Sequence, residues 1–86
     1  MGKVIFEKSA FTDFNEWKKK DKKIYKKITN LISDILQTPY NGIGKPEPLK
    51  FELKGYWSRR INEIHRLVYT VTDEEVIIVS CRYHYE

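Results

Sequence analysis

The sequence has almost no cysteine and no long hydrophobic run, and these deficits exclude whole classes of protein. Cys81 is the only cysteine among 86 residues, so an internal disulfide is excluded, and a reducing cytoplasm is the expected compartment. No stretch approaches the roughly 18 consecutive apolar residues that a membrane-spanning helix requires. The chain meets a charge at Lys3 and has no long apolar segment near its start, so we expect neither a secretory signal nor membrane contact.

Signatures of phosphate-loop and metal sites are missing as well. Gly42 and Gly44 stand in a loop, but no lysine–serine pair follows them, so a phosphate-binding glycine loop is excluded. His65 and His84 are far apart in the sequence and form no metal-ligand spacing, so we predict neither a metal nor a cofactor. A nucleophile made of Cys81 and a histidine stays open, although the apolar strand pattern around Cys81 favours a place in the core.

Positive charge is abundant and unevenly spread. Sixteen Lys and Arg residues face twelve Asp and Glu residues, which gives a formal net charge of +4. Seven lysines crowd into residues 18–27, and all of the arginines fall in the second half of the chain. Positive patches attract polyanions, and guanidinium groups favour bidentate contacts with phosphate. RNA or an acidic protein segment is therefore the expected partner, although a lysine run alone is more often a solvated helix surface.

The first half of the chain predicts one strand and two helices. Residues 3–7 alternate between polar and apolar types, which is typical of a strand. Ser9 is the expected N-cap of a first helix, and Asp21 is the expected N-cap of a second. The second helix carries one apolar stripe and should end before Pro39. That stripe consists of Ile24, Ile28, Leu31, Ile32, Ile35 and Leu36.

The second half predicts a loop followed by a meander of strands. Prolines and glycines indicate a loop over residues 38–48. Strand patterns follow over residues 49–53, 56–61, 65–72 and 76–82, and the run Val76–Val79 suggests a central strand covered on both faces. The predicted fold class is α+β, a single domain of residues 1–86 in which an antiparallel sheet of four to five strands carries a two-helix hairpin on one face.

One set of residues is suited to acid–base chemistry on a phosphodiester. RNA supplies its own nucleophile, the 2′-hydroxyl, so a protein needs a base, an acid and cations around the phosphate. Glu47 stands between Pro46 and Pro48, whose fixed φ angles narrow the directions its carboxylate can take. An imidazole at His84 suits the acid. Glu47 as an ordinary exposed turn residue is the competing interpretation, and local sequence alone favours it.

Four stretches in this order and spacing closely resemble the YoeB/Txe toxins of the RelE superfamily. They are Gly44–Lys50, Tyr56–Ile61, Glu63 with His65–Tyr69, and Cys81–Tyr85. The resemblance covers nearly the whole chain and implies a RelE-like, microbial RNase-like fold. It also implies a toxin of a type II toxin–antitoxin system, a metal-independent endoribonuclease that cleaves mRNA in the ribosomal A site and inhibits translation. The implied partners are mRNA on the ribosome, a YefM-like antitoxin, a second copy in a homodimer, and operator DNA through the antitoxin complex only.

The resemblance also implies roles for individual residues. Glu47 resembles the general base, Arg66 the stabiliser of the transition-state phosphate, and His84 the general acid. Tyr85 resembles the terminal tyrosine that orients the substrate. The predicted substrate-binding residues are Lys50, Arg59 and Arg60.

Several alternatives remain beside these roles. Arg59 could instead cover the core with its stem or pair with a glutamate on a neighbouring strand. The chain departs from the family at Glu86, which adds a carboxylate beyond the usual terminal tyrosine, and at Phe51, where some relatives have histidine. A non-catalytic basic module that binds RNA or an acidic protein segment is the competing function.

Overall fold

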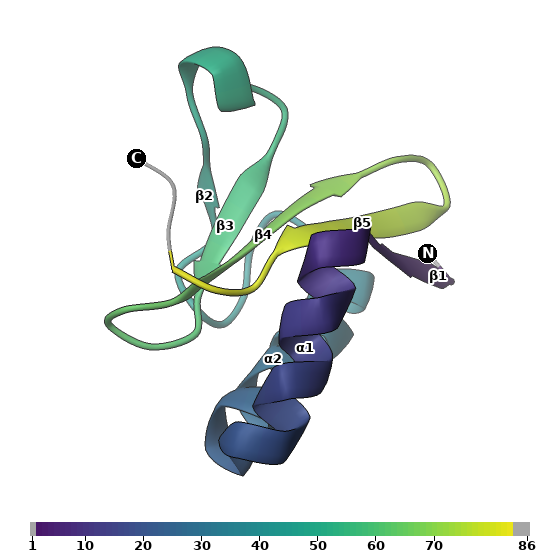
Figure 1. Ribbon diagram of the computed structural model, residues 1–86. Coiled ribbons are helices and arrows are strands. Elements are labelled where there is room, and N and C mark those ends of the chain that lie inside the picture. The colour runs from purple at the N-terminus through teal and green to yellow at the C-terminus, as the bar shows by residue number, and fades with distance from the viewer. Residues whose placement is uncertain (1, 84–86) are drawn as a thin grey trace.

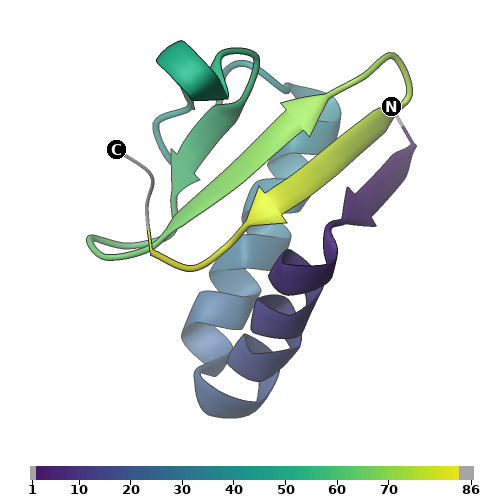
Figure 2. The same cartoon turned by 45° about the horizontal axis from the view of Figure 1, so that its top comes forward.

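The computed structural model describes residues 2–83, which form two helices and a five-stranded sheet (Figure 1). The elements are β1 (Lys3–Phe6), α1 (Lys8–Lys20), α2 (Lys22–Gln37), β2 (Glu47–Pro48), the 3-10 helix η1 (Phe51–Leu53), β3 (Trp57–Arg60), β4 (Arg66–Val71) and β5 (Glu75–Ser80). Both helices lie on the same side of the sheet (Figure 2). The predicted α+β class with a two-helix hairpin is therefore confirmed.

The sheet has the strand order β1-β5-β4-β3-β2. Its four later strands pair antiparallel, as predicted. The first strand differs, because β1 runs parallel to β5 and makes the sheet mixed. The two helices lie between β1 and the other four strands in the sequence. In the sheet, β1 occupies the edge next to β5.

The helical hairpin follows the sequence prediction except at its start. The Asp21 carboxylate accepts hydrogen bonds from the backbone N–H groups of Lys23 and Ile24, at 3.1 and 3.3 Å, and so caps α2. Ser9 was predicted to cap α1, and this is wrong. The helix already begins at Lys8, with Glu7 at the cap position and no side-chain cap bond.

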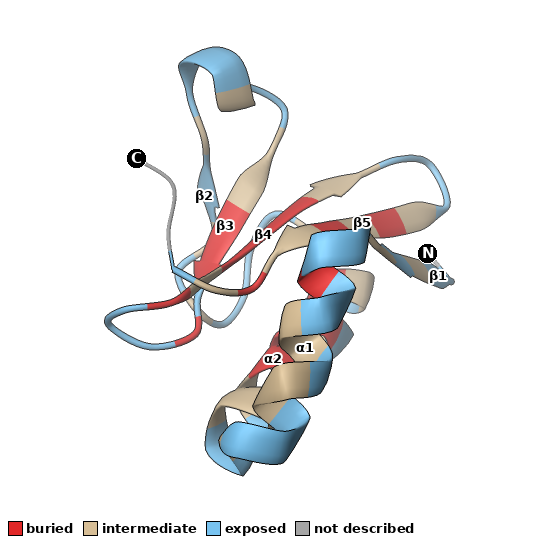
Figure 3. Cartoon of the chain, viewed as in Figure 1, coloured by how far each residue is buried: buried red, intermediate tan, exposed pale blue. Residues whose placement is uncertain are grey.

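The core lies between α2 and the facing side of the sheet, which we call the helix face (Figure 3). The buried part of the α2 stripe consists of Ile28, Leu31, Ile32 and Ile35. On β5 only Val76 and Ile78 are completely buried, and the residues beside them are half-buried. The prediction that β5 is covered on both faces is therefore wrong, because the helices cover only the helix face. The other side of the sheet is called the open face below.

The segment between β2 and β3 departs from its predicted strand. Residues 49–53 contain η1, because Phe51 has a left-handed backbone with φ of 58° that interrupts the extended chain. Leu49 N–H donates to the carbonyl of Tyr56 at 2.9 Å, so η1 forms the tip of a long hairpin. The predicted loop over residues 38–48 also ends early, because Glu47 and Pro48 pair with β3.

A buried arginine joins the sheet to the end of α2. The Arg59 side chain is completely buried, and all five of its N–H donors have acceptors. The acceptors are the Tyr69 hydroxyl, the Asp34 carboxylate, and the carbonyls of Ile43, Thr38 and Asn41. The hydrogen bond from Arg59, assisted by one from Ile43 N–H, holds the pKa of Asp34 below its usual value.

The loop wrapped around Arg59 depends on two glycines. Gly42 and Gly44 have φ angles of 123° and 80°, which side chains rarely adopt. A Cβ on Gly42 would meet the Asp34 carboxylate, and one on Gly44 would lie 2.7 Å from Leu31. The Gly44 carbonyl accepts the Arg60 N–H at 2.7 Å, so the loop leads the chain directly into β2. The Arg59 network therefore fixes the loop that precedes β2, and with it the place of Glu47 at the start of that strand.

Replacing Arg59 with lysine should destabilise the fold strongly. A lysine has three donors for five acceptors, so at least two acceptors lose their partner, at about 1–3 kcal/mol each. We expect Arg59→Lys to lower the free energy of unfolding by about 2–5 kcal/mol, measured by urea titration. Arg60→Lys, at the exposed next position, is the matched control and should change it by less than about 0.5 kcal/mol. If the two variants unfold at the same urea concentration, this role of Arg59 is contradicted.

Candidate active site

The fold brings Glu47 and Arg66 together although they are 19 positions apart in the sequence. Glu47 lies on β2 and Arg66 begins β4, with β3 between them. The Glu47 Oε1 and Arg66 Nη1 atoms are 3.7 Å apart. The Glu47 side chain is 59% exposed and that of Arg66 is 27% exposed, so water and a substrate both reach this ion pair. The predicted base and the predicted phosphate-binding cation therefore share one site.

A second arginine stands directly opposite Arg66. Arg60 pairs with Arg66 in the β3–β4 register, so the two side chains leave the sheet on the same side. Side chains alternate along a strand, and Arg59 lies on the helix face, so Arg60 and Arg66 project from the open face. Like charges directly opposite each other are unfavourable. A bound anion would relieve this repulsion, which makes the pair a candidate phosphate site.

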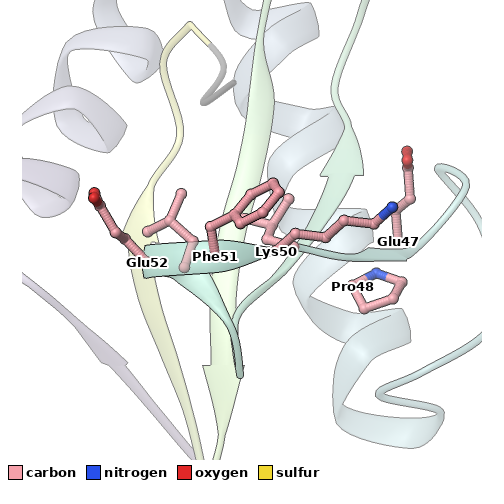
Figure 4. Close-up of a pocket in the computed structure, with 7 residues that line it drawn as sticks. Glu47, Pro48, Lys50, Phe51 and Glu52 are labelled. Carbon is pink, nitrogen blue, oxygen red and sulfur yellow. The ribbon is translucent and has the colours of Figure 1, made fainter.

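A cavity of about 500 Å³ is lined by residues 47–53, among them Glu47 (Figure 4). Lys50 is exposed, and its side chain extends in the direction of Glu47. Phe51 is 91% exposed. The cavity therefore offers a carboxylate, an ammonium group and an aromatic ring to a ligand.

Backbone strain is concentrated around the same site. Among residues 2–83, the non-glycine residues with positive φ are Lys45, Phe51 and Tyr83, at 51°, 58° and 57°. Each such conformation costs roughly 1–2 kcal/mol. Lys45 lies two residues before Glu47, Phe51 lines the cavity, and Tyr83 bonds to the backbone of Arg66. Strained residues that gather in one place indicate a functional site.

The remaining predicted site residues have different outcomes. Arg59 is completely buried, so its predicted contact with a substrate is wrong, and its role is structural. His84 and Tyr85, the predicted acid and orienting tyrosine, lie outside the described residues, as does Glu86. Their neighbour Tyr83 is described, and its carbonyl accepts the Arg66 N–H at 2.8 Å.

Sequence reasoning found no metal-ligand spacing for His65 and gave this residue no role in the site. The His65 Nδ1 atom accepts the Tyr83 N–H at 2.8 Å. Because the partner is a backbone group 18 positions away, no pattern of side chains signals this contact. His65 is therefore part of the site's support, through the segment that carries Tyr83.

Cys81 belongs to the core, as its strand pattern indicated. The side chain is completely buried, and burial raises the pKa of the thiol to about 12. At neutral pH the thiol is therefore protonated, which argues against the Cys81–histidine nucleophile. Among the described residues, no His, Cys, Asp and Glu side chains gather in a group of three that could hold a metal ion. Within the same residues, neither helix is long and apolar enough to span a membrane.

Over nearly its whole length, the chain is similar to one group of bacterial proteins. Residues 6–85 match the family described as YoeB-like toxin of bacterial type II toxin–antitoxin system. The Toxin YoeB of Escherichia coli strain K12 is 54% identical over 83 residues, which cover 96% of this chain and 99% of that protein. The solved YoeB/ParE toxin from Agrobacterium tumefaciens has 41% identity and a TM-score of 0.94, with 96% of this chain and 99% of that chain covered.

Two solved structures from Staphylococcus aureus show assemblies of such toxins. A YoeB dimer has 49% identity to this chain and a TM-score of 0.92, with 98% of each chain covered. A YoeB–YefM toxin–antitoxin complex, described as heterotetrameric, contains a chain with 49% identity and a TM-score of 0.91, with 99% of each chain covered.

The Cys81 thiol should be almost inert in the folded protein. With a pKa of about 12, roughly one molecule in 10⁴ carries the reactive thiolate at pH 8, against roughly a quarter for an ordinary cysteine. We expect alkylation by iodoacetamide at pH 8 to be about 10³-fold slower in buffer than in guanidinium chloride. Mass spectrometry measures both rates on the same preparation. Rates within tenfold of each other would show that the thiol is accessible and ionised, contrary to its place in the core.

Proposed function

Since this chain belongs to the YoeB-like toxins of bacterial type II toxin–antitoxin systems, we propose that it is an endoribonuclease that cleaves mRNA on the ribosome and so inhibits translation. The observation that carries the proposal is the Glu47–Arg66 ion pair on the open face, with Arg60 directly opposite Arg66. A carboxylate held beside two cations suits a phosphodiester, because the base and the charge stabiliser then meet at one phosphate.

The proposed reaction is a transesterification within the RNA. Glu47 accepts the proton of the 2′-hydroxyl, and the 2′-oxygen attacks the adjacent phosphorus. Arg66 stabilises the negative charge that develops on the phosphoryl oxygens. His84 donates a proton to the departing 5′-oxygen, so the products are a 2′,3′-cyclic phosphate and a free 5′-hydroxyl. The reaction needs no metal, because the proton transfers and the charge neutralisation come from side chains.

Substrate contacts are proposed for Lys50, Arg60 and Tyr85. Lys50 lines the cavity beside Glu47, and Arg60 faces Arg66 across the strands, so both can contact phosphates on either side of the cut. Tyr85 orients the substrate, and aromatic rings of this kind stack on unpaired RNA bases. Phe51 has no titratable group, so the acid role falls to His84 alone.

We propose that the toxin is held inactive by a YefM-like antitoxin and acts in the cytoplasm, where its substrate is. The related toxin from Staphylococcus aureus forms a complex with YefM and also a dimer, which supports the same partners for this chain. The formal charge of +4 suits an acidic partner segment. Operator DNA is reached only through the toxin–antitoxin complex.

One observation favours the second candidate, a basic module that binds RNA or an acidic protein segment without cleavage. The turn between α1 and α2 displays exposed lysines at positions 18, 19, 20, 22, 23 and 26. Such a surface binds polyanions without any catalytic group. The Glu47–Arg66 pair separates the two functions, because a module that only binds a polyanion has no use for a carboxylate in its binding site.

Removing the proposed base should abolish cleavage without loss of the fold. Glu47→Gln keeps the size of the side chain but cannot accept a proton, so we expect kcat for ribosome-bound mRNA to fall about 10²–10⁴-fold. Glu74→Gln, an exposed carboxylate in the β4–β5 turn, is the control and should cleave like the wild type. Primer extension on a translated message measures the cut. If Glu47→Gln cleaves normally, the base is assigned wrongly; if wild type and variant both bind RNA without cutting it, the second candidate function holds.

Cleavage should depend on the ribosome. The proposed site has one general base and no metal, so it relies on the ribosome to bend the mRNA until the 2′-oxygen, the phosphorus and the 5′-oxygen are in line. We expect cleavage of a ribosome-bound transcript to exceed that of the same free transcript by about 10²-fold or more. Single-turnover rates on the two forms of one RNA measure the difference. Equal rates would show that the protein aligns the RNA without help.

A further inference from the structure

Three of the hydrogen bonds that hold the described end of the chain join its backbone to distant parts of the fold. After β5 ends at Ser80, the Trp17 indole N–H donates to the Cys81 carbonyl at 3.0 Å. The Arg66 N–H donates to the Tyr83 carbonyl, and the Tyr83 N–H donates to His65 Nδ1, both at 2.8 Å. The ends of small domains usually fray. Here residues 81–83 are tied to α1, to the turn before β4, and to β4 itself.

The imidazole of His65 is a rigid acceptor. The Asn62 side chain accepts the His65 N–H at 2.7 Å, and the His65 carbonyl accepts the Ile61 N–H at 3.0 Å, which closes the turn. The ring lies with its centroid 4.8 Å from the ring of Trp17 and 5.3 Å from that of Tyr83. The residue is only 8% exposed. The direction of its Nδ1 lone pair is therefore set by the closed turn and by packing against these two aromatic rings.

The Tyr83 N–H needs an unprotonated Nδ1, so the proton of the neutral ring sits on Nε2. Burial lowers the pKa of His65, and the positive charge of Arg82 lowers it further. Arg82 is in turn paired with Asp13 and Glu16 of α1, at 3.5 and 3.1 Å. The charged neighbours of His65 in the sequence are Glu63, within its turn, and Arg66, at the start of β4.

We propose that His65 is a positioning residue for the proposed reaction: its Nδ1 holds the N–H of Tyr83, the residue that precedes the proposed general acid His84 in the sequence, while Arg66 holds the Tyr83 carbonyl. This inference rests on the proposed function for its catalytic consequence. The Tyr83 carbonyl accepts the Arg66 N–H at 2.8 Å, so Arg66 fixes the direction of this carbonyl. His65 and Arg66, adjacent in sequence, thus hold the two polar backbone groups of Tyr83.

The left-handed backbone of Tyr83 shows why an acceptor is needed there. A φ of 57° costs a tyrosine roughly 1–2 kcal/mol, so the conformation persists only while other contacts hold it. When His65 takes up a second proton, Nδ1–H faces the Tyr83 N–H, and two donors repel each other. Tyr83 then relaxes to an ordinary φ, and its carbonyl leaves the Arg66 N–H.

The pH dependence follows from the direction of the pKa shift. Because the pKa of His65 is lowered in the folded protein, the neutral form and its bond to Tyr83 are fully present above the ordinary histidine pKa of about 6.5. They are lost as the pH falls below that value toward the pKa of the folded state. An asparagine at this position cannot lose its acceptor in this way.

Two substitutions at His65 separate positioning from packing. Asparagine carries its amide oxygen on Cγ, the atom that bears Nδ1 in histidine, so His65→Asn keeps an acceptor but loses most of the ring contacts. His65→Leu fills the space better and has no acceptor. If His65 positions Tyr83, His65→Asn should cleave faster than His65→Leu. If His65 only fills space in the fold, the order should be reversed. We expect His65→Leu to lose about 10²-fold in kcat with KM unchanged, because a misaimed acid slows the chemical step and leaves mRNA binding intact.

The activity assay uses ribosome-bound mRNA, at a temperature where both variants are folded by circular dichroism. We expect the ratio of wild-type to His65→Asn activity to be constant above about pH 6.5 and to fall below it. The titration of Glu47 cancels in this ratio, since both proteins contain it. His65→Leu cleaving as well as His65→Asn, or a ratio that rises as the pH falls below about 6.5, would overturn the proposal.

Hydrogen exchange tests the contact without reference to activity. We expect the Tyr83 amide, observed by NMR, to exchange at least about tenfold faster in His65→Leu than in wild type and His65→Asn. Equal protection in all three proteins would sink the inference while leaving the proposed nuclease untouched. Conversely, a wild type that never cuts mRNA would refute the proposed function, while the exchange rates still decide whether His65 holds Tyr83.

Discussion

The buried guanidinium of Arg59 is the constraint on which the rest of the structure depends. It binds the last turns of α2, the loop that follows, and Tyr69 of β4, so a single side chain holds both layers of the fold. The loop around it delivers Glu47 to β2. Arg59 and Arg60 are neighbours on β3, and Arg60 projects from the open face, where it lies opposite Arg66 of β4. Alternation along β3 thus assigns two adjacent arginines to different tasks, one inside the protein and one at its surface.

Local patterns predicted the helices well and the irregular segments poorly. The α2 stripe repeats over several turns and Asp21 sits at its start, so both signals agree and both are confirmed. The segment at residues 49–53 resembled a strand, because nothing in the sequence marks Phe51 as left-handed. Arg59 and Arg60 were indistinguishable by residue type. Their difference depends on Asp34, which lies 25 positions from Arg59 and becomes its neighbour only in the folded chain.

The candidate site was predictable to the extent that side chains define it. Glu47 and Arg66 were named from the resemblance and their chemistry, and strand pairing brings them to 3.7 Å. The support of the site was not predictable, because it consists of contacts to the backbone. The Gly44 carbonyl accepts the Arg60 N–H, and the His65 Nδ1 atom accepts the Tyr83 N–H. Every residue except proline has a backbone N–H, so residue type does not indicate which of these groups will form such a contact. The positive φ values of Lys45 and Tyr83 were hidden for the same reason.

The strand order has a consequence for biosynthesis. β1 is synthesised before both helices, yet its partner β5 follows all the other strands. Until β5 emerges, β1 has no neighbour and part of the apolar surface of the helices remains uncovered. Pairing between distant segments is slow to form, so the sheet and the core beneath it are complete only after β5 has been synthesised.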